Sequence, residues 1–255
     1  MGERRVQYAK LQLSDDNKIY MISVCIATYN GERFIRQQIE SIVCQLNVDD
    51  EIIVSDDGST DGTLDVISSM DDRRIRIIEG PKKKSLIPNF ENALKAAKGD
   101  CIFLADQDDV WKPNKVEVCI KWLQKYDCVV TDAEVTDSNL NPIYPSLYAI
   151  MQVRQSRIYN TIWKNGYTGC CMAFRRNVLE ASLPFPKDIP MHDIWIGNVA
   201  AYKYNVKFIP DTLIYFRRHE DTTSCNGKGS KYSIWQQMKF RWSVIKNIAN
   251  LYIKF

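Results

Sequence analysis

The chain has 255 residues, of which 45% are hydrophobic and 25% are charged, the usual balance of a globular protein. This balance excludes collagen, a coiled coil or disorder for most of the chain, and the length fits a single α/β domain. The 34 basic and 31 acidic residues give a net charge of +3, which is too even for a protein defined by nucleic-acid binding.

Residues 1–20 carry charges without hydrophobic periodicity, so we expect a flexible extension there. They are too polar for a signal peptide, and no apolar stretch approaches the roughly 18 residues needed to span a bilayer. The eight cysteines include no Cys-x-x-Cys pair, which argues against a zinc site and favours reduced thiols in the core. Together these features predict a cytoplasmic protein.

The following part of the chain alternates short apolar runs with amphipathic segments. The apolar runs predict buried strands, and apolar residues at helical spacing between them predict helices. This alternation indicates parallel βαβ units, in which ligands bind at the carboxyl ends of the strands. Strands are predicted at residues 22–27, 51–55, 74–78, 101–105, 128–131, 206–209 and 212–216, and helices at residues 34–43, 64–70, 89–97 and 113–126.

The most informative motif follows the strand at 101–105, where Asp106, Asp108 and Asp109 fall in one turn. Like charges this close repel one another, and a divalent metal with oxygen ligands, Mn²⁺ or Mg²⁺, offsets the repulsion. The alternative is a solvated acidic turn in which one Asp caps the next helix.

Two other strand ends carry polar residues that suit a nucleotide. Asp57 follows the strand at 51–55, where a carboxylate accepts hydrogen bonds from a base or a ribose. Tyr29 follows the first strand, where its ring is placed to stack on a base. Each segment also has the composition of an ordinary turn. The sequence contains neither the P-loop nor the dinucleotide fingerprint, which argues against P-loop ATPases and Rossmann dehydrogenases.

Three motifs in this order, ATYNGERF, VSDDGSTDGT and FLADQDDVW, resemble the nucleotide-sugar-binding half of family 2 glycosyltransferases. The resemblance continues through TGCCMAF, MHDIW and YFRRHEDTTS, a combination most similar to bacterial rhamnosyltransferases that build surface polysaccharides. It implies the GT-A fold, an α/β fold with a Rossmann-like mixed sheet flanked by helices. It also implies that residues 21–130 bind the nucleotide sugar and that residues 131–230 bind the acceptor.

The resemblance implies roles for individual residues as well. Asp193 matches the catalytic base, and Asp108 matches the metal ligand of the family's Asp-x-Asp motif. His219 lies where some relatives supply a metal ligand or a diphosphate contact, and His192 replaces the acidic residue typical before the base. Asp109 either supports the water shell of the metal or caps the next helix. The implied donor contacts are Ala27, Tyr29, Asp57 and Asp106, with Arg217 or Arg218 pairing with the diphosphate.

The C-terminal segment 231–255 contains five basic residues and no acidic residue, so the rest of the chain has a net charge of −2. Ile234, Met238 and Trp242 begin an apolar series at helical spacing. The pattern is typical of an amphipathic helix on an anionic membrane surface, here the inner face of the cell membrane. A helix packed on the domain, with its cations in water, is the alternative.

The sequence therefore predicts an inverting, metal-dependent glycosyltransferase without a nucleic-acid partner. Its donor is a nucleoside-diphosphate sugar, with dTDP-rhamnose or a UDP-hexose favoured, and its acceptor is a hydroxyl of a glycan or lipid-linked saccharide. A nucleotidyltransferase is a second interpretation, although the Gly-rich basic loop usual after its first strand is absent here. A degenerate binding module is a third, against which the intact Asp57, Asp106, Asp108 and Asp193 count.

Overall fold

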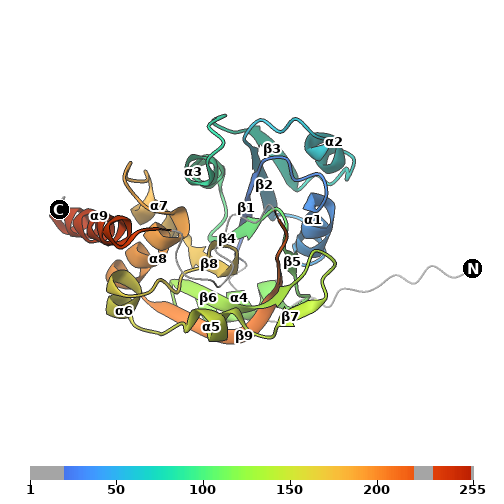
Figure 1. The fold of residues 1–255 in the computed structure, drawn as a ribbon. Coiled ribbons are helices and arrows are strands. Elements are labelled where there is room, and N and C mark those ends of the chain that lie inside the picture. Colours follow the sequence, from blue (N-terminus) through green and yellow to red (C-terminus); the bar gives the residue numbers. More distant parts are fainter. Residues whose placement is uncertain (1–19, 221–231, 254–255) are drawn as a thin grey trace, which may run out of the picture.

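The computed structural model describes residues 20–220 and 232–253. The expected extension at 1–20 therefore lies outside the described residues except for Tyr20, and residues 221–231 and 254–255 lie outside them too. The described chain forms one curled sheet flanked by helices, and the C-terminal helix lies at one edge of the molecule (Figure 1).

Nine strands of the described chain form a single mixed sheet. They are β1 (Ile22–Thr28), β2 (Glu51–Asp56), β3 (Ile75–Glu79), β4 (Cys101–Asp106), β5 (Val110–Trp111), β6 (Cys128–Thr136), β7 (Pro142–Tyr144), β8 (Met172–Arg175) and β9 (Val206–Arg217). Their order is β3–β2–β1–β4–β8–β6–β9–β5, with β7 paired to β6. The first four strands in this order are parallel, β8 is antiparallel to both of its neighbours, and β6 and β9 are parallel.

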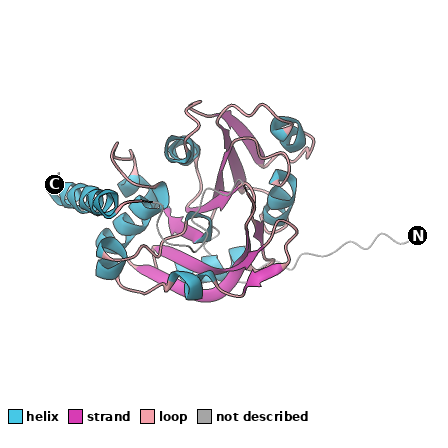
Figure 2. Cartoon of the chain, in the orientation of Figure 1, coloured by secondary structure: helices cyan, strands magenta, loops and turns pink. Residues whose placement is uncertain are grey.

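Helices lie on both faces of the sheet (Figure 2). They are α1 (Ile35–Val43), α2 (Thr63–Ser68), α3 (Leu86–Ala96), α4 (Lys115–Leu123), α5 (Leu147–Met151), α6 (Arg157–Ile162), α7 (Arg176–Ser182), α8 (His192–Lys203) and α9 (Ile234–Ile253), with a short 3-10 turn, η1, at Gly169–Cys171. Helix α3 packs on β1 and β2, and α4 packs on β6. The predicted mixed sheet flanked by helices is confirmed.

Burial on both faces explains why the central strands could be predicted from the sequence. All residues of β1 and β2 are buried, and so is β4 up to Ala105. A strand covered on both faces is apolar throughout instead of alternating with polar residues. The predicted boundaries of these three strands agree with the structure to within one residue at each end.

Several predicted boundaries are wrong, each for a local reason. Helix α3 begins at Leu86, three residues before the prediction, because Pro88 falls in its first turn, where no N–H is needed. Helix α2 runs from Thr63 to Ser68, one residue before the predicted start and two before the predicted end, and Asp61 Oδ1 accepts a hydrogen bond from its first N–H (3.1 Å). The two strands expected at 206–216 are one strand, β9, whose pairing with β6 shifts register near Thr131.

Candidate active site

The carboxyl ends of β1, β2 and β4 meet, as expected of neighbouring parallel strands. Ala27 pairs with Asp106 in the sheet. The loops after β1 and β2 are joined by two hydrogen bonds, since the Asn30 N–H donates to Ser59 Oγ (2.9 Å) and the Thr60 N–H donates to Asn30 Oδ1 (2.8 Å). The three loops that carry the sequence motifs therefore form one surface.

Gln107 fastens the acidic loop to the loop after β1. Its Oε1 accepts hydrogen bonds from Thr28 Oγ1 (2.6 Å) and from the Tyr29 N–H (3.0 Å), and its Nε2 donates to the Tyr29 carbonyl (3.2 Å). A Cβ on Gly31 would come within 2.5 Å of Gln107 Oε1, so this close approach requires glycine. Sequence analysis did not single out Gln107, whose role depends on backbone partners.

Asp57 is buried beneath the loop that leads into α3. Its Oδ1 accepts a hydrogen bond from the Lys83 N–H (3.1 Å), and its Oδ2 accepts one from the Ser85 N–H (3.0 Å). The same loop places Lys84 Nζ 5.2 Å from the centre of the Tyr29 ring. Asp57 and Tyr29, both predicted donor contacts, thus lie at the same basic loop.

Asp108 and His219 are 111 residues apart in sequence and meet in the structure. Asp108 Oδ2 lies 2.8 Å from His219 Nε2, and both side chains are largely buried. Strand β9 ends two residues before His219 and so delivers it to the acidic loop. The structure thus brings together the two residues predicted to bind metal.

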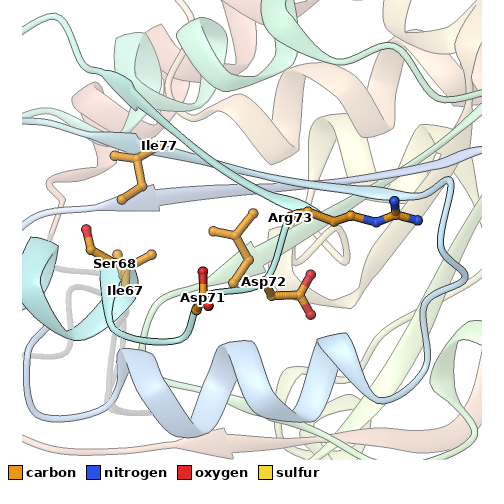
Figure 3. A pocket seen from close by; sticks show the side chains of 7 residues that line it. Ile67, Ser68, Asp71, Asp72, Arg73 and Ile77 are labelled. Carbon is orange, nitrogen blue, oxygen red and sulfur yellow. The ribbon is translucent and has the colours of Figure 1, made fainter.

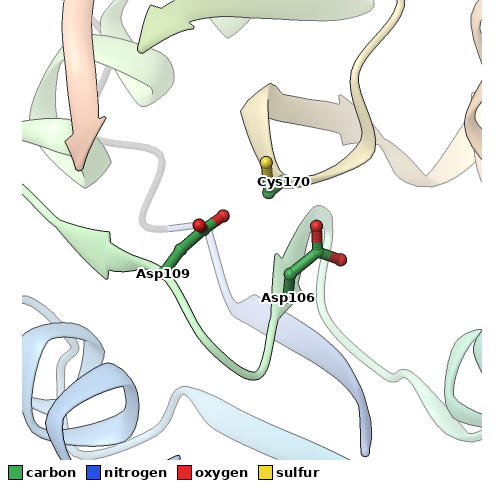
Figure 4. A group of neighbouring side chains, drawn as sticks. All are labelled: Asp106, Asp109 and Cys170. Atoms are coloured by element: carbon green, nitrogen blue, oxygen red, sulfur yellow. The ribbon is translucent and has the colours of Figure 1, made fainter. Parts of the chain in front are cut away.

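Asp106 and Asp109 converge on Cys170 of η1. One ligand atom of each lies within 4.8 Å of the others, and Figure 4 shows the Asp109 carboxylate pointing toward Cys170 with Asp106 alongside. Burial, followed by the charges of Asp108 and Asp193, raises the pKa of Asp106 to about 7. Burial and the charge of Asp108 also raise the pKa of Asp109. The loop therefore holds more negative charge than it can ionise without a cation.

Asp109 does not cap a helix. Its Oδ1 accepts a hydrogen bond from the Arg217 N–H (3.0 Å), whereas α4 begins after Asn114 with no side-chain cap. Its Oδ2 is buried and has no partner among the described residues. The capping interpretation is wrong, while the interpretation that Asp109 supports a metal's water shell remains a prediction.

The two arginines at the end of β9 differ in their surroundings. The Arg217 guanidinium donates to Gln37 Oε1 (2.7 Å) and to the Ser138 carbonyl (2.9 Å), and it lies 4.4 Å from the centre of the Phe34 ring. The Arg218 guanidinium is partly exposed and lies over the Phe216 ring. Arg217 is thus held by protein partners, and both arginines lie at the end of the strand that leads to His219.

Asp193 lies in the first turn of α8, where backbone donors hold its carboxylate. Its Oδ2 accepts a hydrogen bond from the Gly169 N–H (3.0 Å), and its Oδ1 accepts one from the Ile194 N–H (2.7 Å). Burial raises the pKa of Asp193 to about 6. Since its charge also raises the pKa of Asp106, the predicted base and the donor loops share one site.

His192 is buried beside that base. Its ring stacks on Phe90 with centroids 4.0 Å apart, and neither ring nitrogen has a partner among the described residues. Burial lowers the pKa of His192 to about 3, so the ring is neutral at pH 7. The residue before the base therefore contributes packing without charge, unlike the acidic residue typical of the family.

The site contains features that suit a divalent metal. Asp108, Asp106 and Asp109 supply carboxylate oxygens, the ligands that Mn²⁺ and Mg²⁺ prefer, and Asp109 Oδ2 lacks a partner among the described residues. A hydrogen bond with Cys171 and burial raise the pKa of Cys170, which keeps its thiol protonated and makes it a poor ligand. Asp108 and His219, which lie in contact with each other beside this cluster of carboxylates, remain the predicted metal ligands.

A buried lysine, Lys115, lies beneath the site, and no sequence motif predicted it. Lys115 is fully buried, its Nζ donates to the Cys170 carbonyl (3.1 Å), and it lies over the Trp111 ring. A lysine in the first turn of a helix gives no sequence signal of burial.

A surface pocket elsewhere has no part in this site. It lies beside α2 and β3, and Figure 3 shows its lining side chains, including Ile67, Asp71 and Ile77. Asp72 in its wall already pairs with Arg74 at 2.7 Å. None of the predicted site residues lines it.

Two relatives of known description resemble most of the chain. It is 27% identical over 248 residues to the dTDP-rhamnosyl transferase RfbG of Shigella flexneri, covering 87% of this chain and 79% of that protein. It is 29% identical over 167 residues to the UDP-Glc:alpha-D-GlcNAc-diphosphoundecaprenol beta-1,3-glucosyltransferase WfgD of Escherichia coli. That match covers 66% of this chain and 64% of the relative, so the chain spans just under two-thirds of the relative's length.

Two solved structures share the fold. Staphylococcus aureus TarS in complex with UDP-GlcNAc matches with a TM-score of 0.67 at 18% identity, covering 91% of this chain and 66% of that chain. Glucosyl-3-phosphoglycerate synthase from Mycobacterium tuberculosis, in complex with Mn²⁺, UDP and glucosyl-3-phosphoglycerate, matches with a TM-score of 0.57 at 18% identity, covering 91% and 80%. These likenesses confirm the predicted GT-A fold.

A family model identifies the chain directly. The model described as Glycosyl transferase family 2 matches residues 23–183, which is more than half of the chain and includes all three donor-side motifs. The match supports the family resemblance found in the sequence, and the relatives include a rhamnosyl transferase, RfbG. The chain therefore belongs to glycosyl transferase family 2.

Proposed function

We propose that this protein is an inverting glycosyltransferase, which moves a sugar from a nucleoside diphosphate to a hydroxyl of a glycan or lipid-linked saccharide. One observation carries the proposal. Asp193, at the start of α8, accepts a hydrogen bond from the Gly169 N–H (3.0 Å), and the next residue, Cys170, lies within 4.8 Å of ligand atoms of Asp106 and Asp109. A candidate base and an acidic donor site that share one space are what a direct displacement requires.

Asp193 acts as the general base in this proposal. The acceptor hydroxyl must lose its proton as its oxygen attacks the anomeric carbon from the face opposite the diphosphate. The raised pKa of about 6 leaves Asp193 ionised at pH 7 yet more basic than an ordinary carboxylate. Hydrogen bonds from the Gly169 and Ile194 N–H groups fix the orientation of the carboxylate. A single displacement inverts the anomeric centre and needs no covalent nucleophile.

The donor side holds the nucleotide and its leaving diphosphate. Residues 21–130 bind the donor in this proposal, with Ala27, Tyr29, Asp57 and Asp106 at the nucleoside and sugar, and residues 131–230 bind the acceptor. Arg217 or Arg218, at the end of β9, pairs with the diphosphate. When bound at Asp108 and His219, Mn²⁺ or Mg²⁺ supplies positive charge that offsets the charge of the departing nucleoside diphosphate.

The relatives indicate the class of donor and acceptor. RfbG is described as a dTDP-rhamnosyl transferase, and the described substrates of WfgD are UDP-glucose and a diphosphoundecaprenol-linked sugar. By analogy, dTDP-rhamnose or a UDP-hexose is the proposed donor, and a lipid-linked saccharide of a bacterial surface polysaccharide such as O-antigen or capsule is the proposed acceptor. Such an acceptor would place the protein at the inner face of the cell membrane, with segment 231–255 as the candidate membrane contact.

A transfer assay with matched variants tests the proposal. The protein is incubated with dTDP-rhamnose or UDP-glucose, Mn²⁺ and a panel of glycan and lipid-linked acceptors, and released nucleoside diphosphate is measured. Asp193→Asn should slow transfer by about 10²–10⁴-fold while the donor still binds. Asp211→Asn, at an exposed carboxylate of β9, is the control and should transfer normally.

Three outcomes would contradict the proposal. Unchanged transfer by Asp193→Asn would refute the assignment of the base. Release of inorganic pyrophosphate in a parallel incubation with a nucleoside triphosphate and a sugar 1-phosphate would indicate a nucleotidyltransferase instead. Donor binding without turnover across the acceptor panel would indicate a degenerate binding module.

A further inference from the structure

We propose that α6 and α9 together form a docking surface for an anionic lipid bilayer, which we call the α6–α9 surface. This inference extends the proposed function, because a lipid-linked acceptor resides at a bilayer. Its apolar part consists of Ile158, Ile162 and Trp163 at α6 and of Trp235, Met238 and Trp242 on α9, all exposed.

Helix α9 has two apolar faces, and the protein covers only one of them. Val244 and Ile248 are buried where α9 packs on α8. Trp235 is 80% exposed and Trp242 is 67% exposed, and both lie on a different side of the helix. The two interpretations of segment 231–255 are therefore compatible, because one face packs on the domain while the other faces solvent.

Helix α6 extends the exposed apolar surface. It contacts α9, and the Arg241 guanidinium donates a hydrogen bond to the Trp163 carbonyl (2.7 Å). Trp163, at the C-terminal end of α6, is 71% exposed. Figure 1 shows α6 and α9 at the same edge of the molecule. Two segments that are distant in sequence thus meet, and each carries exposed tryptophan.

The positive charge around these tryptophans favours an anionic partner. Residues 154–164 contain three basic residues and no acidic residue, and residues 231–255 contain five basic residues and no acidic residue. Of these cations, Lys164 and Lys239 are exposed, whereas Lys246 lies 3.9 Å from Asp188. Exposed tryptophans near the exposed Lys164 and Lys239 match the interfacial region of an anionic bilayer. A second copy of the chain would oppose these cations with its own, which disfavours a dimer.

The α6–α9 surface would rest on the face of the bilayer. Among the helices of residues 20–220 and 232–253, none combines the length and apolar character needed to span a membrane. The packing of α9 is firm, because Ser243 Oγ donates to the Asp188 carbonyl (2.7 Å) in the loop before α8. Helix α8 carries Asp193 in its first turn, so docking through α9 would hold the proposed base close to a lipid-linked acceptor.

Vesicle co-sedimentation of the full chain, without donor or acceptor, tests this inference. The protein should sediment with vesicles of phosphatidylcholine and phosphatidylglycerol, only weakly with phosphatidylcholine alone, and less as salt is added. Because no sugar is present, failure to bind would leave the transferase proposal untouched. Conversely, an inactive protein that binds these vesicles would refute the transferase proposal alone.

Paired variants test whether both helices contribute. Lys164→Gln combined with Lys239→Gln should weaken binding by about 25-fold, at about fivefold for each cation. Lys121→Gln combined with Lys125→Gln, two exposed lysines on and just after α4, is the matched control and should bind normally. Trp163→Ser should weaken binding, whereas Val48→Ser, which removes an exposed apolar side chain elsewhere, should not.

Three results would overturn the inference. The first is absence of wild-type binding to the anionic vesicles. The second is normal binding by Trp163→Ser, which would leave α9 as the sole contact. The third is a dimer in light scattering that the Trp242→Ser variant abolishes, which would assign the surface to a second copy of this chain. Circular dichroism of each variant checks that the fold is retained.

Discussion

At the scale of single residues, burial makes the carboxylate of Asp193 more basic. Burial raises its pKa to about 6, whereas an ordinary Asp titrates near 4. The backbone N–H groups of Gly169 and Ile194 oppose this shift, because they stabilise the ionised form. The side chain is therefore a stronger base than an exposed carboxylate and is still ionised at pH 7.

This pKa predicts the acid limb of the pH–rate profile. Only the ionised carboxylate can accept a proton, so kcat/KM should fall by about tenfold for each pH unit below about 6 and level off above that value. The rate of nucleoside diphosphate release is measured from about pH 4, where an ordinary Asp titrates, to about pH 8, with donor binding measured at each pH as the control. A rate that stays constant down to the pH of an ordinary Asp would contradict the assignment.

The neighbouring His192 predicts an effect on stability. Its buried ring nitrogens have no partner among the described residues, and an unsatisfied buried polar group costs about 1–3 kcal/mol. His192→Phe keeps the shape of the stack on Phe90 and removes these nitrogens, so the melting temperature should rise by several degrees, at about 2–4 °C per kcal/mol.

The pH dependence of stability in the same variant distinguishes the effect of the His192 charge from the effect of its packing. The pKa of folded His192 is lowered to about 3, while an unfolded His titrates near 6.5. Between these values the unfolded chain takes up a proton that the folded chain excludes, so the wild type loses stability as the pH falls below about 6.5. The advantage of His192→Phe should therefore widen between pH 7.5 and 5.5 (about 1.4 kcal/mol per pH unit below the unfolded pKa). An unchanged difference in melting temperature would show that the ring is not buried in its neutral form.

At the scale of elements, the site depends on how the loops after β1 and β4 are joined. Gln107 makes three hydrogen bonds to Thr28 and Tyr29, and no other residue type of this size both accepts and donates in that way. Gln107→Leu keeps the volume and removes the bonds. Nucleotide affinity should fall by roughly tenfold, equivalent to about 1.4 kcal/mol, as Tyr29 loses its fixed position.

Isothermal titration with UDP or dTDP checks this effect. Gln124→Leu, at an exposed glutamine just after α4, is the matched control and should bind nucleotide as the wild type does. If Gln107→Leu also bound normally, the loop after β1 would be held by other contacts.

The elements also differ in how well the sequence predicts them. The fully buried strands β1, β2 and β4 are continuous apolar runs between turn residues, so their boundaries were predicted closely. The elements η1, β8, α5 and α6 were not predicted, because each is shorter than two turns of helix or than five strand residues and shows no periodicity. The antiparallel insertion of β8 between β4 and β6 depends on tertiary packing alone.

At the scale of the whole molecule, the fold brings distant motifs to one edge of the sheet. The sequence predicted that the loops after the first, second and fourth strands would meet, since neighbouring parallel strands end on the same side. It gave no geometric reason to place His219 beside Asp108, and only the family resemblance suggested it. Gln107 and Lys115 went unnoticed because their partners are mainly backbone carbonyl and N–H groups, which leave no pattern in the sequence.

The most direct test of the account is the thermal stability of the protein with UDP, dTDP, GDP or CMP, each with and without Mn²⁺. A nucleotide at 100 times its Kd adds about 2.7 kcal/mol, or roughly 5–10 °C for a domain of this size. We expect a shift with one of the diphosphates that depends on Mn²⁺ and that Asp108→Asn abolishes, while Asp211→Asn retains it. A shift that is independent of metal, or no shift with any nucleotide, would contradict a metal-assisted nucleotide-sugar site at Asp108 and His219.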